Sequence, residues 1–109
     1  LGALKEGKLV TGPKESIRPP ETVWFGSDSV HEILGIGNIF QEEGKPKIHL
    51  HTGAGREDNV KVGCLRGESE VFMVVEVFIF ELEGISARRV MDEEQGFAPV
   101  CFGNVPEIE

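Results

Sequence analysis

The sequence is short of basic residues, which argues against a general nucleic-acid binder. Of its 109 residues, 11 are lysine or arginine and 19 are aspartate or glutamate, so the formal net charge is -8. Proteins that bind nucleic acid without sequence preference neutralise phosphates with patches of lysine and arginine. We therefore expect direct binding to DNA to be weak or absent.

Cysteine is scarce, and long apolar runs are absent. Cys64 and Cys101 are too few for a disulfide scaffold, and both lie among apolar residues, where reduced thiols are common. The longest apolar run, Val71 to Val75, is far shorter than the roughly 20 residues of a membrane-spanning helix. With no secretory signal in the sequence, we expect a cytoplasmic protein that contacts no membrane.

Helical patterning is also missing. No window carries a capped apolar stripe at helical spacing, whereas glycine, proline and other turn residues recur along the whole chain. The runs between these turns are typical of strands, and a chain of this length forms one domain. The predicted strands cover residues 3–10, 22–26, 29–40, 47–53, 59–66, 70–83, 86–92 and 97–102.

The run from Val71 to Phe80 is apolar on both faces except at Glu76. A strand buried on both sides has this pattern, so we expect the run to form the centre of the sheet. Gly35 and Gly37 interrupt another apolar strand and predict bulges there. No repeat or low-complexity segment divides the chain, so we expect a single domain over residues 1–102 and a polar tail over 103–109.

The His49-Leu50-His51 segment is the sharpest local feature. Residues two apart on a strand point to the same face, about 7 Å apart, so two imidazoles there can converge on one metal ion. Cys64 is the best third ligand if the next strand pairs with the first, and His31 is the alternative. Each residue also has an ordinary structural interpretation: two polar surface histidines and a small buried thiol.

Glu76 is the acidic residue of the most apolar run. A carboxylate buried there must be paired, metal-bound or protonated. It could hydrogen-bond a ligating histidine or fill a fourth metal position. A structural ion pair with Arg56, Arg66 or Arg88 is an equally good interpretation.

Several short motifs follow one another in a specific order. They are His31-Glu32-Ile33-Leu34-Gly35-Ile36-Gly37-Asn38-Ile39, Gly44-Lys45-Pro46, His49-Leu50-His51, Val62-Gly63-Cys64-Leu65-Arg66-Gly67 and Val75-Glu76-Val77. Together they resemble the plants and prokaryotes conserved (PPC) domain, with matching order from about Gly2 to Phe102. The order is more specific than any one motif.

This resemblance implies an α+β fold dominated by a mostly antiparallel, strongly bent sheet that assembles as a homotrimer. In plants the domain accompanies AT-hooks in nuclear DNA-binding proteins and contacts transcription factors, so other regulatory proteins are expected partners. Prokaryotic members stand alone and carry a DNA-binding label by analogy. This sequence has no Arg-Gly-Arg-Pro hook, so the analogy is only weak support for DNA binding by this chain.

Two departures from the family pattern matter. The third histidine of the family is Cys64 here, which keeps a metal ligand but changes its softness, and this favours a site of His49, His51 and Cys64. We expect its cofactor to be a divalent metal, zinc above others. The family also opens with a strand and its main helix, roughly thirty residues, that have no counterpart here, so we expect little helix and an apolar sheet face that is either uncovered or covered by a neighbouring chain.

A small metal-dependent enzyme with a three-ligand zinc site is the alternative function. Cupins also place His-x-His on a strand, but their pattern continues with a nearby glutamate and a later histidine. Here Glu57 lies too far along, and no histidine follows His51. The sequence thus favours a metal-binding, trimeric interaction domain over an enzyme.

Overall fold

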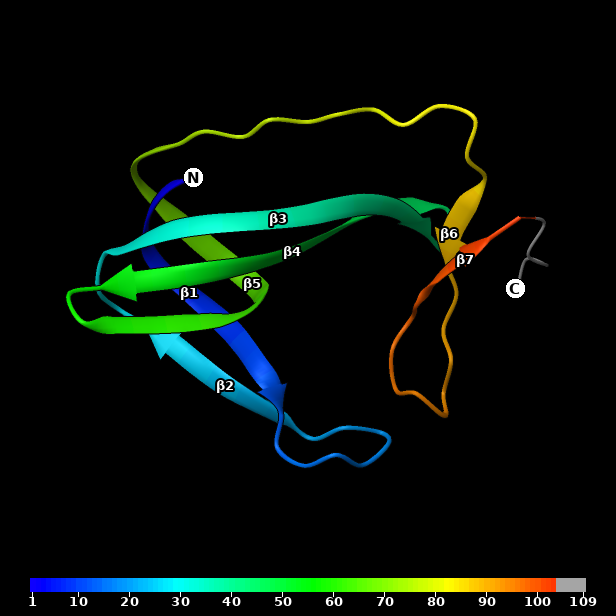
Figure 1. Ribbon diagram of the computed structural model, residues 1–109, viewed down its shortest axis with the longest axis horizontal. Coiled ribbons are helices and arrows are strands. Elements are labelled where there is room, and N and C mark those ends of the chain that lie inside the picture. Colours follow the sequence, from blue (N-terminus) through cyan, green and yellow to red (C-terminus); the bar gives the residue numbers. More distant parts are fainter. Residues whose placement is uncertain (104–109) are drawn as a thin grey trace.

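The computed structural model describes residues 1–103, and these form seven strands (Figure 1). The strands are β1 (Gly2–Pro13), β2 (Thr22–Ser27), β3 (His31–Glu42), β4 (Lys45–Arg56), β5 (Asn59–Val75), β6 (Ala87–Arg89) and β7 (Val100–Phe102). Residues 1–103 include no helix, so nothing in this part of the chain could cross a membrane as a helix. The expected α+β class is therefore wrong in its helical part, and the described fold is all-β.

The strands form one mixed, mostly antiparallel sheet in the order β2-β1-β5-β4-β3-β6-β7. The pairing of β3 with β6 is parallel, and the other neighbouring pairs are antiparallel. The start of β1 also pairs with β3, where Leu4 lies opposite His31. The sheet therefore curls back on itself at this end, and the β6–β7 hairpin lies at the other end of β3 (Figure 1).

The pairing of β3 with β4 is regular along its whole length. The register runs without a shift from Glu32 opposite Gly55 to Glu42 opposite Lys45, so the bulges predicted at two glycines of β3 are absent. The register shifts lie instead between β1 and β5, and between β1 and β2 near Pro13. The irregular pairs are therefore those of β1, the strand that contacts three others.

The core is small and lies on one face of the sheet. Four residues that are each at least nine-tenths buried form it, with three partly buried side chains packed against them. These are Leu4, Leu9, Ile33 and Ala54, with Phe25, Leu65 and Val75. Since no helix covers the sheet within residues 1–103, most other large apolar side chains stay exposed.

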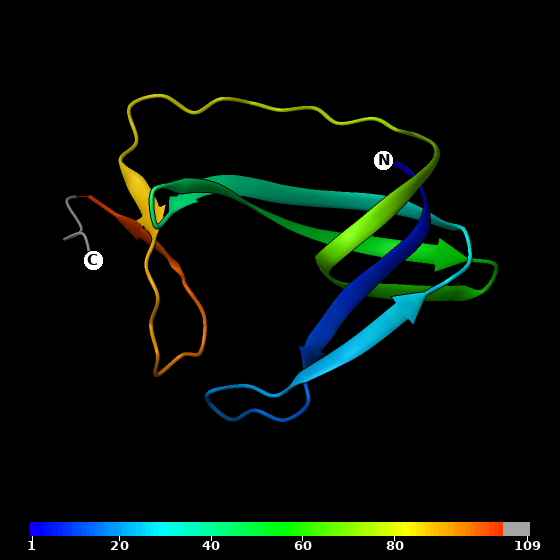
Figure 2. The same ribbon diagram turned by 180° about the vertical axis from the view of Figure 1, so that it is seen from behind.

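The apolar run from Val71 to Phe80 does not form the centre of the sheet. Strand β5 ends at Val75, and the next residue, Glu76, exchanges two backbone hydrogen bonds with Leu1. From there residues 77–86 arch away as an extended segment that no described strand pairs with (Figures 1 and 2). The prediction of burial on both faces is wrong for the single chain, because β1 is the only described strand that pairs with this run and its pairing stops at Val75, opposite Gly2.

The predicted polar tail, residues 103–109, lies outside the described residues except for Gly103.

Candidate metal centre

Strands β4 and β5 place three potential ligands on one face of the sheet. His49 and His51 are two residues apart on β4 and therefore share a face. The antiparallel register sets Cys64 of β5 directly opposite His51, and directly opposed residues also share a face. The core residues Leu9 and Leu65 belong to the opposite face, since they alternate with Val10 and Cys64 along paired strands.

The three side chains converge. One ligand atom from each of His49, His51 and Cys64 lies within 4.8 Å of the others. The Cys64 Sγ atom is 3.9 Å from His49 Nε2, and the two imidazole centroids are 5.3 Å apart. Two imidazole nitrogens with one sulfur form a donor set that suits zinc. The group could hold a metal ion, and the predicted ligands are the residues that the structure brings together.

The group is open on one side. Cys64 is 4 % exposed, His49 is half-buried and His51 is exposed to solvent. A metal bound by these three side chains would keep at least one position for a ligand from outside, as catalytic zinc sites do. The arrangement therefore differs from a closed four-ligand structural site.

Two glycines let neighbouring strands approach the ligand-bearing residues. A Cβ atom on Gly37 would collide with the His49 carbonyl oxygen and lie 3.0 Å from Leu50 Cα. A Cβ atom on Gly63 would collide with the Val10 carbonyl oxygen, directly before Cys64 in the chain. Neither glycine has a positive φ, so the constraint is close approach and not backbone conformation.

Arg66 contacts the candidate thiol ligand. Its Nε–H donates to Cys64 Sγ over 3.1 Å, because the two residues are two apart on β5 and share a face. The charge-assisted bond would stabilise a thiolate in the geometry of a metal ligand.

Arg89 approaches the group from β6. Its Nη2 donates to Asn38 Oδ1 over 2.9 Å, and Asn38 is the direct neighbour of His49 across β3 and β4. Nη1 donates to the Ala98 carbonyl oxygen over 2.9 Å, a bond within the C-terminal hairpin. The cation therefore lies one side chain away from a ligand.

The surroundings of His49 favour its neutral form. Partial burial lowers its pKa from 6.5, and the positive charge of Arg89 and the nearby His51, Arg66 and Lys47 lower it further. Neutral imidazole is the form that binds metal.

Sequence reasoning missed the roles of Arg66, Arg89 and Asn38. Arg66 could have been found, because it follows Cys64 by two positions on a predicted strand. Arg89 could not, since only the parallel pairing of β6 with β3 brings it near.

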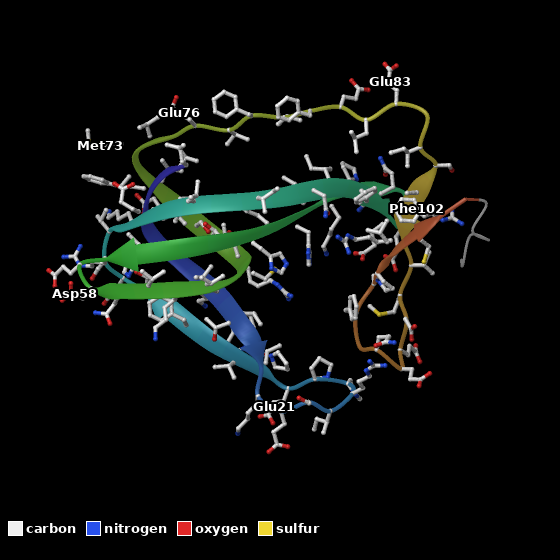
Figure 3. The ribbon with its side chains drawn as sticks, in the orientation of Figure 1. Glu21, Asp58, Met73, Glu76, Glu83 and Phe102 are labelled. Atoms are coloured by element: carbon white, nitrogen blue, oxygen red, sulfur yellow. The ribbon has the colours of Figure 1, made fainter. Side chains whose placement is uncertain are left out.

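The two further candidates lie outside the group in the described chain. His31 Nδ1 is 2.8 Å from both Ser27 Oγ and the Ser29 carbonyl oxygen, and its ring meets Phe25 edge-on. These contacts order the turn between β2 and β3. Glu76 lies directly before the arching segment and is exposed, so its expected burial is wrong (Figure 3).

A small, strongly bent β-sheet domain with a candidate His/His/Cys metal site is the class that fold and site define. Comparison with protein families then identifies it: the sequence model of the Plants and Prokaryotes Conserved (PCC) domain matches residues 1–83. The chain belongs to the PCC domain family. Searches among curated proteins and solved structures found no match.

Proposed function

We propose that this protein is a metal-binding interaction domain that works as a homotrimer and holds one zinc ion per chain. The convergence of His49, His51 and Cys64, with ligand atoms within 4.8 Å of one another, is the observation that carries the metal part. The mixed nitrogen and sulfur donors favour zinc over magnesium or calcium, which prefer oxygen.

Metal analysis of the purified protein tests this proposal. We expect about one zinc ion per chain, as structural and catalytic zinc sites bind stoichiometrically. Cys64→Ser should lose most of the metal, because a hydroxyl is a far poorer ligand than a thiolate. Cys101→Ser is the matched control and should keep it, since Cys101 lies on β7 and contacts the Pro99 carbonyl oxygen.

Equal zinc content in the two cysteine variants would contradict the assignment of Cys64. A wild-type protein that takes up no zinc, cobalt or cadmium after reduction and dialysis would contradict the metal-binding function itself.

The exposed surface supports self-association. The chain exposes 8697 Å², against about 6,000 Å² for a compact folded monomer of this mass. Its radius of gyration is 15.7 Å, against about 13 Å for a compact domain of this length. A closed trimer would bury part of this excess without open-ended polymerisation.

A small zinc enzyme is the second candidate. Solvent reaches His51, so a substrate or water could reach a metal bound there. Hydrolysis of an activated ester by the zinc-loaded protein, abolished by Cys64→Ser and kept by Cys101→Ser, would favour this candidate over a purely interacting domain.

A further inference from the structure

Two arginines beside the metal group have no acidic partner. The ion pairs among residues 1–103 are Lys5–Glu70, Lys14–Glu21 and Lys47–Glu42, and none of them includes Arg66 or Arg89. The chain has 19 acidic and 11 basic residues, so its composition does not lack carboxylates. Two unpaired guanidinium groups at one place therefore mark a local excess of positive charge.

The burial of Arg89 makes its positive charge energetically unfavourable. It is 9 % exposed, and its Nε atom is buried with no hydrogen-bond partner. A buried cation without a counter-ion is unfavourable, and an anion nearby would offset that cost. Arg89 also orients Asn38: because Oδ1 accepts the bond from Nη2, the amide Nδ2 is left to donate on the face that carries His49.

Arg66 supplies donors that are ready for a ligand. Its Nε is used by Cys64 Sγ, while its terminal nitrogens donate to no described residue, and the side chain is exposed. Because the guanidinium is planar and already touches the sulfur, these nitrogens lie beside any ion that the sulfur binds.

We propose that the metal ion and Arg66 together bind a small carboxylate anion, with the Asn38 amide as a further donor and the charge of Arg89 as support. The inference rests on the proposed metal function, since the metal offers one of the two contacts. A carboxylate suits the site because its two oxygens can divide between a metal position and the guanidinium. The anion fills the side of the group that the three protein ligands leave open.

Acetate titration of the cobalt-loaded protein tests the proposal, because the visible spectrum of cobalt responds to a change of ligand. At constant ionic strength in perchlorate, we expect acetate to shift the spectrum with saturation. Arg66→Gln should weaken acetate binding about tenfold or more, the loss expected for one hydrogen bond between charged groups. Arg56→Gln is the control matched for charge, since Arg56 lies at the far end of β4 and donates to the Val30 carbonyl oxygen.

Asn38→Asp gives a second test that leaves Arg66 on Cys64. An aspartate still accepts from Arg89, yet it loses the amide donor and adds a negative charge, so acetate binding should weaken here too. This variant decides the question if Arg66→Gln no longer loads cobalt.

The outcomes separate the two proposals. If cobalt does not bind to the wild-type protein, the metal function and the anion site both fail. If cobalt binds and acetate affinity is the same in wild type, Arg66→Gln and Asn38→Asp, the metal function stands and the anion site is refuted. Tighter binding of inorganic phosphate than of acetate would also refute the carboxylate assignment.

Discussion

His49 is the candidate ligand whose chemistry the fold changes most clearly. Burial and four neighbouring basic side chains act on it in the same direction and favour its neutral form. In the metal-free protein, the half-buried His49 therefore already favours the neutral form that could bind a metal. Its neighbour Cys64 accepts a hydrogen bond from Arg66.

The pKa of His49 can be predicted for the metal-free protein. Its pKa should lie below the ordinary 6.5, because burial and the charge of Arg89 disfavour the imidazolium. The folded chain then binds fewer protons than the unfolded chain between that lowered pKa and 6.5. Stability is therefore present above pH 6.5 and decreases as the pH falls through this interval.

An NMR titration of the imidazole resonances, assigned with His49→Gln, measures this pKa. Urea denaturation at several pH values then checks the sign, and His49→Gln should show a weaker loss of stability on acidification. A His49 pKa at or above 6.5 would contradict the prediction.

At the scale of the element, the contact between β3 and β4 holds the histidines in place. Gly37 lies opposite Leu50, between the two ligand positions, and leaves no room for a side chain. Gly37 therefore allows β3 to lie close to β4 at the point where a metal would bind.

Gly37→Ala should weaken metal binding without changing a ligand. The added methyl group forces β3 and β4 apart, which costs about 1–3 kcal/mol in unfolding free energy and displaces His49. Urea denaturation and a zinc competition assay measure the two effects. Gly26→Ala is the control, because a Cβ atom on that β2 residue meets nothing within 4 Å. Equal zinc affinity in both variants would contradict this account.

The local elements were largely predictable from the sequence, and their partners were less so. Turn residues and alternation placed most strands, and same-face spacing predicted that His49 and His51 converge, while the family resemblance favoured Cys64 over His31 as the third ligand. Glycines at 35 and 37 were misinterpreted, because spacing alone does not distinguish a bulge from a close strand approach.

The apolar run after Val71 was misplaced for a different reason. Its pattern reports that the segment is suited to burial, but it does not report whether the covering surface belongs to the same chain. In the described chain Phe78 and Phe80 are 77 % and 85 % exposed. The position of Arg89 near the candidate site could not be predicted, because it depends on a parallel strand pairing that leaves no local pattern in the sequence.

At the scale of the whole molecule, the arching segment is the feature that a trimer should cover. Light scattering after gel filtration should give the mass of three chains at micromolar concentration. Replacing Phe78 and Phe80 together by glutamate should shift the protein toward monomer, because charged side chains cannot enter an apolar interface.

The control for assembly is Glu81→Gln, which changes a polar residue of the same exposed segment and should leave the mass unchanged. A monodisperse wild-type monomer would contradict the trimer, and an intact trimer in the double variant would exclude this segment from the interface.

Duplex DNA should bind weakly or not at all. The net charge of -8 per chain repels phosphates, and a trimer carries three times that charge. Fluorescence anisotropy with a labelled duplex at about 150 mM salt measures this directly. Sub-micromolar affinity with a steep salt dependence would overturn the expectation.

The hairpin of β6 and β7 lies beyond residues 1–83, which the family model matches, and it pairs with β3, the neighbour of the histidine-bearing strand β4. Arg89 reaches Asn38 from this hairpin, and Asn38 neighbours His49. The ligands and the charge beside them thus come from different parts of the chain. Changes in the hairpin alone can adjust the electrostatics of the metal group, so divergence at the C-terminal end offers a route to new ligand preferences on an unchanged scaffold.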